Sequence, residues 1–361
     1  MEFSPVWRRI QRSLFPRIED CLGPLTEEHR KIVAILEIVR IEDQIRQHRR
    51  GTGRPPHDWL PIARAFMAKA ILNLSSTRAL IERLQADATL RGILGFRAGM
   101  PLPHESAFSR VFGVLARTEI PERTHAALVD RFVKDPGIAH AALDASAICA
   151  REKARNTRKS MAVKIKRKRG RPKKGETVPP PEVSGVARII PMKPSAMKRA
   201  LPGDCSWGAK RNSQGQYEVW KGYKLPVSVV EGGLPVSCLL TSASLHDSQA
   251  APFLLKKTAR KVQEYCLADA AYDAASLRTL AKGLGLVPVI DQNPRRGEKI
   301  PMEPDGALRY KTRTQVERFF ARLKDEFGGR MIFVRGNRKV MTHLNYGVLA
   351  ILADQLLASV S

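Results

Sequence analysis

The sequence predicts an α/β protein in which an all-α region, residues 1–136, precedes a mixed α/β domain, residues 137–361. Up to Pro136-Gly137, apolar residues recur at the spacing of amphipathic helices, and prolines separate the segments. Beyond that point, short apolar runs alternate with segments of helical period. A chain of 361 residues has room for about two or three domains and a substantial core.

Helical periodicity predicts four helices in the N-terminal region. Their expected ranges are 27–49, 59–74, 77–90 and 106–116. Prolines at Pro101, Pro103 and Pro121 fall in the connections, where the missing backbone N–H does no harm to a helix.

Predicted strands and helices alternate in the C-terminal region. A buried strand at 138–143 is followed by an insert rich in Lys, Arg and Pro that extends to about 204. Strands 217–230 and 234–242 flank the turn Glu231-Gly232-Gly233. A helix from 248, a strand at 262–268, a helix from 274, a strand at 286–290 and the helix containing Glu317 complete the order. This order suits a ribonuclease-H-like fold, in which helices flank a mixed sheet.

Composition narrows the class of partner. Sixty-two Lys and Arg against thirty-five Asp and Glu give a net charge of +27 and a pI near 10.4, which points to a polyanion, most often nucleic acid. Five scattered cysteines without a C-x-x-C pair indicate a reduced protein without structural zinc. The apolar stretch at 347–360 is too short to span a bilayer, and the N-terminus lacks the apolar core of a secretion signal. We therefore expect a soluble, cytoplasmic protein.

Tyr310, Arg313, Glu317 and Lys324 lie at offsets of 0, 3, 7 and 14 in the segment YKTRTQVERFFARLK. In a continuous α-helix these offsets fall at about 0°, −60°, −20° and −40°, so one narrow stripe carries a phenol, two cations and a carboxylate. A helix used only for packing needs a core face and a solvent face, and this stripe is additional to both. Glu317 could instead close a capping box with Thr314.

The same four residues match the signature Y-(2)-R-(3)-E-(6)-K, which resembles bacterial insertion-sequence transposases of the family-four and family-five type with a DDE catalytic core. The resemblance implies that Glu317 is the third of three metal-binding carboxylates. The other two would be Asp144, which ends the first predicted strand, and Asp269, which ends the fourth in a D-x-x-Y-D motif. Each aspartate taken alone is also compatible with a turn or helix cap.

Two acidic residues near these carboxylates are expected to be helix N-caps and not metal ligands. Asp273, the last residue of D-x-x-Y-D, is expected to cap the helix from 274. The pair His246-Asp247 also resembles the family, but Asp247 is expected to cap the helix from 248.

Three carboxylates suit phosphodiester chemistry. Two Mg²⁺ ions, with Mn²⁺ able to substitute, would activate the attacking oxygen and neutralise the leaving oxygen. On this interpretation Asp144, Asp269 and Glu317 are both the catalytic and the metal-binding residues. Arg313 and Lys324 would grip DNA phosphates, and Tyr310 would orient a phosphate or a terminal hydroxyl.

The insert after the first strand is strongly basic. Residues 151–177 contain thirteen Lys and Arg and two Glu, and Arg169-Gly170-Arg171-Pro172 resembles an AT-hook that reads a narrow minor groove. A solvated basic linker is the alternative. In either case we expect the insert to be disordered without DNA, because it has too little apolar surface to bury.

Further candidate DNA contacts lie near the predicted strands. Trp207 and Trp220 could stack on an unpaired base, although packing at the sheet edge is the simpler expectation. Arg295 and Arg296 follow the fifth strand and are expected to contact DNA.

Together these features predict a DNA transposase of an insertion sequence. It would bind terminal inverted repeats, cleave DNA and join 3′-hydroxyl ends to target DNA, as a homodimer associated with the bacterial nucleoid and with the helical region serving DNA binding or dimerisation. Two alternatives are a nuclease of the same fold that does not join ends and a non-catalytic DNA-binding protein derived from a transposase.

Overall fold

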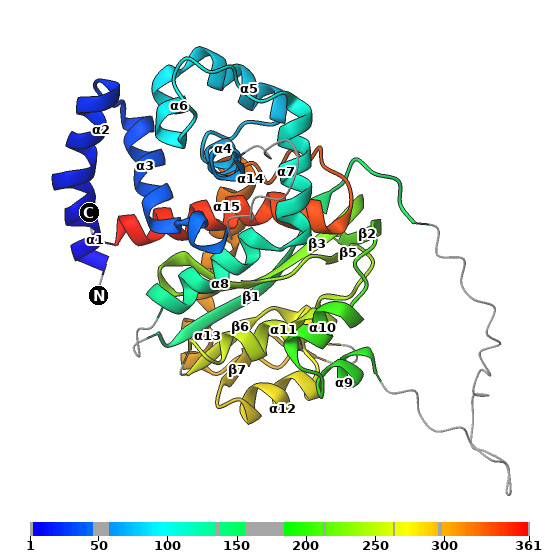
Figure 1. The fold of residues 1–361 in the computed structure, drawn as a ribbon. Coiled ribbons are helices and arrows are strands. Elements are labelled where there is room, and N and C mark those ends of the chain that lie inside the picture. The colour runs from blue at the N-terminus through cyan, green and yellow to red at the C-terminus, as the bar shows by residue number, and fades with distance from the viewer. Residues whose placement is uncertain are drawn as a thin grey trace, which may run out of the picture.

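The computed structural model describes residues 3–45, 58–133, 138–155, 184–211, 214–262, 264–294 and 298–359. Helices from the N-terminal part form one layer, and a mixed sheet with its own helices forms another (Figure 1). One continuous apolar core joins the two layers, since it runs from Ile32 and Phe66 among the helices to Leu143 and Val227 in the sheet.

The N-terminal layer contains α1 (Phe3–Arg9), a π-helical segment (Ile10–Leu14), α2 (Phe15–Leu22), α3 (Glu27–Val39), a 3₁₀ turn (Ile41–Gln44), α4 (Trp59–Ile71), α5 (Thr77–Ala86), α6 (Ala88–Leu94), α7 (Glu105–Arg117) and α8 (Ile120–Phe132). The helix expected at 27–49 ends at Val39, because Arg40 adopts a left-handed conformation with φ of 45°. The helix expected at 77–90 divides in two, because the Asp87 side chain accepts a hydrogen bond from the Leu90 N–H and starts α6.

The sheet contains β1 (His140–Cys149), β2 (Ser206–Arg211), β3 (Tyr217–Val230), β4 (Leu234–Cys238), β5 (Thr241–Ser242), β6 (Tyr265–Ala268) and β7 (Val287–Ile290). Its seven strands follow the order β2-β3-β1-β6-β7, with β4 and β5 also paired to β3. β1 is antiparallel to β3 and parallel to β6, and β6 is parallel to β7. The predicted mixed sheet of a ribonuclease-H-like domain is confirmed.

The helices of this layer are α9 (Gly185–Ile189), α10 (Pro194–Ala200), α11 (Asp247–Thr258), α12 (Ala275–Gly283), α13 (Pro304–Tyr310) and α14 (Thr314–Asp325), with 3₁₀ turns at Glu231–Gly233, Ala270–Tyr272 and Lys311–Arg313. The expectation of a disordered insert to about 204 is wrong for residues 184–204. They form α9 and α10, because Val186, Ile189 and Met197 supply apolar surface that is buried beside α11.

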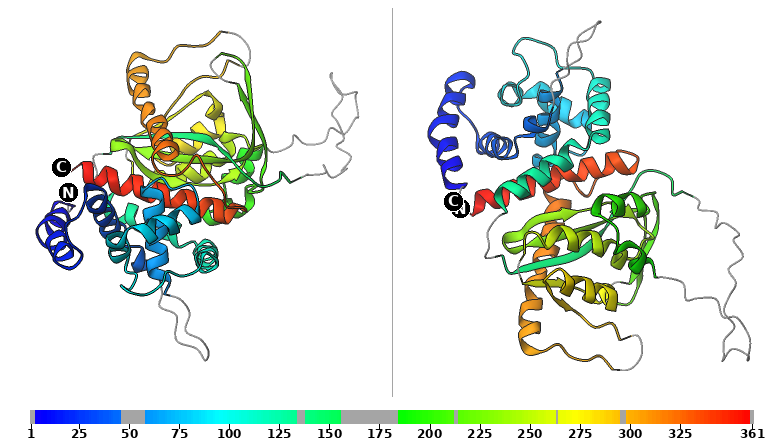
Figure 2. Two further views of the ribbon diagram at one scale, coloured as in Figure 1. Left: turned by 90° about the horizontal axis from the view of Figure 1, so that it is seen from above. Right: turned by 60° about the horizontal axis from the view of Figure 1, so that its bottom comes forward.

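The long helix α15 (Asn337–Ala358) lies between the two layers (Figure 2). It contacts α3, α4, α7 and α8 on one side and β4 and α14 on the other. From Val340 to Ala353 nearly all of its side chains are buried, as a helix needs when both of its sides face protein. In the described part of the chain, no helix is both long and apolar enough to cross a membrane.

The contact between α15 and the end of α14 depends on Gly347. A Cβ at this position would lie 2.7 Å from the Phe327 carbonyl oxygen and 2.7 Å from Leu323 Cδ1, whereas a Cβ at Gly283 of α12 would meet nothing within 4 Å. We expect Gly347→Ala to lower the free energy of unfolding by about 1–3 kcal/mol through overpacking. Gly283→Ala should leave it unchanged or raise it by about 0.5–1 kcal/mol. Urea unfolding of both variants measures this, and equal effects would contradict the close packing of α15.

Candidate active site

Asp144 and Asp269 lie beside one another on neighbouring parallel strands. The last parallel pair of β1 and β6 is Leu143 with Ala268, and each aspartate is the next residue in its chain. The expectation that Asp144 ends its strand is wrong, because β1 continues to Cys149 as the antiparallel partner of β3, with Asp144 opposite Val227. The parallel register alone therefore brings the two carboxylates together where the pairing of β1 with β6 ends.

Backbone hydrogen bonds hold both carboxylates in place. Asp144 Oδ1 accepts from the N–H of Ala145 at 2.7 Å. Asp269 Oδ1 accepts from the N–H of Ala271 at 3.0 Å and so caps the 3₁₀ turn that follows β6. Asp269 thus has the capping role considered from the sequence while its other oxygen remains available.

The two carboxylates share a buried, negatively charged setting. Burial raises the pKa of Asp144 to about 6, the charge of Asp269 adds to this increase, and Arg313 opposes it. The pKa of Asp269 is also raised, first by burial and then by the charges of Asp247 and Asp291. Because like charges are collected here at reduced solvation, a cation at this position would be stabilised.

The predicted stripe is not one continuous helix. Tyr310 ends α13, Arg313 ends the 3₁₀ turn and Glu317 lies in the first turn of α14. The stripe nevertheless faces β1, because α14 packs its apolar residues Val316 and Phe320 against the core. The 3₁₀ turn lets Tyr310 approach Arg313, whose guanidinium carbon lies 5.5 Å from the phenol ring centroid.

Arg313 joins the helix to the first carboxylate. Its Nη1 lies 3.3 Å from Asp144 Oδ2, and its Nη2 lies 2.6 Å from Glu317 Oε1. The guanidinium therefore supplies positive charge between the two carboxylates. The capping box considered for Glu317 is not formed, because α14 has Arg313 at its N-cap and no side-chain cap bond.

Lys324 lies two turns further along α14 and reaches the same strand. Its Nζ donates to Ser146 Oγ at 2.7 Å, and Ser146 is on the same face of β1 as Asp144 because strand residues alternate. Burial lowers the pKa of Lys324, and the charges of Lys210 and Arg330 lower it further. These cations continue the positive charge along β1 away from Asp144.

The oxygen donors of this site suit a hard cation such as Mg²⁺. Among the described residues, however, no group of three His, Cys, Asp or Glu side chains is arranged to hold a metal ion. The Glu317 side chain is 53% exposed, and Arg313 stands between it and Asp144. A metal held by all three carboxylates would require Arg313 to move.

Two further residues belong to this neighbourhood. The Tyr272 side chain is fully buried, its hydroxyl has no hydrogen-bond partner among the described residues, and the charges of Asp247, Asp144 and Asp269 add to burial in raising its pKa. Asp247 Oδ1 lies 2.9 Å from Lys224 Nζ. The D-x-x-Y-D motif contains Tyr272, so the sequence could have pointed to this tyrosine as a residue of the site.

Two capping assignments need correction. His246, not Asp247, is the N-cap of α11, and its ring accepts from the N–H of Ser248. Asp273 is not the N-cap of α12, because that position is Ala274, one residue further on. The Asp273 carboxylate instead accepts hydrogen bonds from the Arg278 side chain and from the N–H of Asn293, which follows β7.

The remaining predicted contacts lie elsewhere or outside the described residues. Trp220 is buried, and its ring N–H donates to the Tyr223 carbonyl at 3.0 Å, so packing is confirmed for this residue. Trp207 is 60% exposed on β2, where its side chain is not packed in the core. The predicted DNA contacts that fall outside the described residues are Arg169, Arg171, Arg295 and Arg296.

Comparison with known protein families agrees with this arrangement. The transposase DDE domain family matches residues 177–353, which include Asp269 and Glu317. A second family described as a transposase domain (DUF772) matches residues 18–113. No curated protein and no solved structure matches the chain. With transposase families matching both layers, the chain belongs to the DDE transposases of insertion sequences.

Proposed function

We propose that this protein is a transposase of the family-four or family-five type that cleaves DNA at terminal inverted repeats and joins 3′-hydroxyl ends to target DNA. The main support is the juxtaposition of Asp144 and Asp269, buried with raised pKa values, while Arg313 and Glu317 approach them from α14. A structural ion pair does not need a second unpaired carboxylate beside it.

Asp144, Asp269 and Glu317 are the residues that would hold two Mg²⁺ ions, with Mn²⁺ able to substitute. When bound, the metal would neutralise charge on the transferring phosphate and activate the attacking water or hydroxyl. The backbone bonds of Ala145 and Ala271 fix one oxygen of each aspartate and so hold the carboxylates in place.

Arg313 and Lys324 would bind the DNA backbone on either side of the cleaved phosphate. Arg313 keeps the carboxylates neutralised before substrate arrives, and its planar guanidinium can exchange a carboxylate for two phosphate oxygens. Lys324 would contact a phosphate further along β1, beside Ser146. Tyr310 would orient the phosphate or the terminal hydroxyl.

For the whole chain, we propose that residues 1–136 serve DNA binding and dimerisation and residues 137–361 serve catalysis, in a homodimer that pairs two DNA ends in the cytoplasm. The helical layer would hold the repeat DNA close to the active site, because α15 ties that layer to β4 and α14.

Asp144→Asn, Asp269→Asn and Glu317→Gln each keep volume but remove a charge. We expect each variant to lose cleavage and strand joining in Mg²⁺, while duplex binding stays within a few-fold of wild type. Gel assays with pre-cut repeat ends and a target plasmid measure both. A variant that joins ends at the wild-type rate would exclude that residue as a metal ligand, and wild-type cleavage without joining would favour a nuclease.

The raised pKa of Asp144 predicts a pH dependence of stability. The folded state favours the protonated carboxyl, so stability relative to Asp144→Asn should be lost as pH rises from about 4 through about 6. Between pH 4 and pH 8 in EDTA, the stability of wild type relative to Asp144→Asn should fall by an amount on the order of 2 kcal/mol. Urea unfolding from pH 4 to 8 tests this; a difference that does not change with pH would contradict it. Added Mg²⁺ should stabilise the wild type more than the variant.

Arg313→Ala and Lys324→Ala test the phosphate contacts. We expect end joining to fall more than tenfold in each variant, because binding energy used in positioning is lost. The matched control is Arg318→Ala on the exposed face of α14, where the guanidinium donates to Thr314 Oγ1 at 3.3 Å. The control should retain activity. If the melting temperature drops strongly and activity per folded molecule is unchanged, Arg313 and Lys324 belong to a structural ion-pair network.

A further inference from the structure

A groove of about 710 Å³ lies at the junction of the helical layer and the segment that leads into α15. Helices α4 and α7 and the start of α5 form one wall, and Arg151, residues 333–335 and the first turns of α15 form the other. α7 and the start of α15 are far apart in sequence, yet they lie side by side in the structure (Figure 2).

Positive charge dominates this groove. Its lining includes Lys69, Arg78, Arg151, Arg335 and Lys339, and Glu105 is the acidic side chain among the lining residues. Within the described part of the chain, Lys69, Arg151, Arg335 and Lys339 form no ion pair with a carboxylate. Their positive charges are therefore available to a bound anion.

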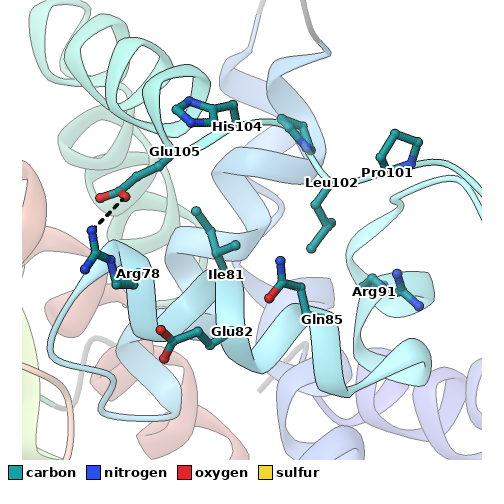
Figure 3. Close-up of a pocket in the computed structure, with 10 residues that line it drawn as sticks. Arg78, Ile81, Glu82, Gln85, Arg91, Pro101, Leu102, His104 and Glu105 are labelled. Carbon is teal, nitrogen blue, oxygen red and sulfur yellow. Dashed lines mark ion pairs between the residues drawn. The ribbon is translucent and has the colours of Figure 1, made fainter.

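The acidic residue already has a cation beside it. Glu105 Oε2 lies 3.9 Å from Arg78 Nη2. Figure 3 shows this pair at the border of a second hollow, into which Ile81 and Leu102 point. Arg78 and Glu105 each line the second hollow and the basic groove, so this pair lies between the two. Glu105 therefore offers little counter-charge to the other cations.

Lys69 is the most unusual residue of the groove. It lies on α4 with only 6% of its surface exposed, and burial lowers the pKa of its ammonium to about 8. The neighbouring His343 supplies no negative charge to Lys69. Burial lowers the pKa of His343 to about 4, so its ring is neutral, and its Nε2 lies 2.9 Å from the Gly328 carbonyl oxygen. A buried ammonium without an anion is unfavourable, and a bound anion would remove that cost.

Other features of the groove suit phosphate. The start of α5 presents Ser75 and Thr77 beside the positive end of the helix. Phe333 is 43% exposed, and the guanidinium carbon of Arg151 lies 5.9 Å from its ring centroid. Phosphate oxygens accept from all of these donors, and Phe333 offers an apolar surface to a sugar.

We propose that this groove binds the phosphate backbone of duplex DNA at a position distant from the catalytic carboxylates. Arg151 follows β1, the strand that carries Asp144 and Ser146. Arg151 comes seven residues after Asp144, so at about 3.3 Å per strand residue the two Cα atoms lie at most roughly 23 Å apart. A duplex rises about 3.4 Å per base pair, so the two positions are at most roughly seven base pairs apart.

Further cations lie near Lys324. Lys324 contacts Ser146, and Lys210 and Arg330 are close enough to Lys324 to lower its pKa. A duplex that enters the groove can therefore follow β1 toward Asp144. This part of the inference, one duplex reaching both places, rests on the proposed function; the anion site itself does not.

The test compares two double variants of equal charge. Arg335→Ala with Lys339→Ala removes two groove cations, and Lys257→Ala with Arg260→Ala removes two exposed cations at the end of α11, away from the groove. The probe is a fluorescent 30-base-pair duplex of random sequence, titrated in EDTA at 50–200 mM KCl. The groove pair should make the salt slope shallower by about 1.8, because each lost phosphate contact removes about 0.9. The control pair should change affinity less than twofold, and equal losses in the two pairs would overturn the proposal.

Lys69→Met separates a binding role from a structural one. Methionine keeps the length of the side chain without its charge, so the thermal midpoint should stay the same or rise. Duplex affinity at pH 7 should fall at least threefold. A lower midpoint with unchanged affinity would make Lys69 structural and overturn its part in the site.

Two comparisons distinguish failure of this inference from failure of the proposed function. Asp144→Asn should bind the random duplex like wild type, whatever its effect on cleavage. Adding Lys324→Ala to the groove pair should reduce the salt slope by about a further 0.9 if one duplex contacts both positions. No further reduction would overturn the shared path along β1.

Discussion

The repulsion between two buried carboxylates is the constraint on which the site depends. Parallel pairing of β1 with β6 places Asp144 and Asp269 together at the carboxyl end of β6 in the middle of the sheet, where burial disfavours their charges. Arg313 offsets part of that cost, and it can do so only because α13, a 3₁₀ turn and α14 hold it against β1. Of these elements, α14 packs on α15, so the sheet register, the break between α13 and α14 and the long central helix all help to position this cluster of charge.

The two basic regions differ in the counter-charge available to them. Beside the carboxylates, each cation has an acceptor: Arg313 has Asp144 and Glu317, and Lys324 has the Ser146 hydroxyl. In the groove, Lys69 has lost hydration without an anion in return. DNA phosphates would therefore replace existing partners of Arg313 and Lys324 beside the carboxylates. In the groove they would supply Lys69 with the negative charge that it lacks. Binding to the groove should accordingly be the more favourable step per contact, with exchange at the carboxylates following.

Sequence patterns predicted most strands of the sheet, because short apolar runs and turn residues are local signals. The strand β2 (Ser206–Arg211) was not predicted, because most of its residues are exposed and it lacks an apolar run. The strand at Tyr217–Val230 has the predicted bounds, whereas Asp144 proved to lie within a strand, since only the antiparallel partner β3 extends β1 past it. Helical offsets placed Tyr310 and Arg313 beside one another, but the 3₁₀ turn between them depends on tertiary packing. The groove was not predicted: Lys69 and Lys339 come from distant segments, and burial of a lysine has no sequence signature.

The position of α15 in the chain has a consequence for biosynthesis. The helices of residues 3–132 leave the ribosome first, yet α3, α4, α7 and α8 pack on a helix that begins at Asn337. Until that helix emerges, these helices can pack on one another, but the sides that pack on α15 stay uncovered. A nascent chain can thus expose the N-terminal helices long before Glu317 is in place, and the site formed by Asp144, Asp269 and Arg313 becomes complete only as the central helix closes the core.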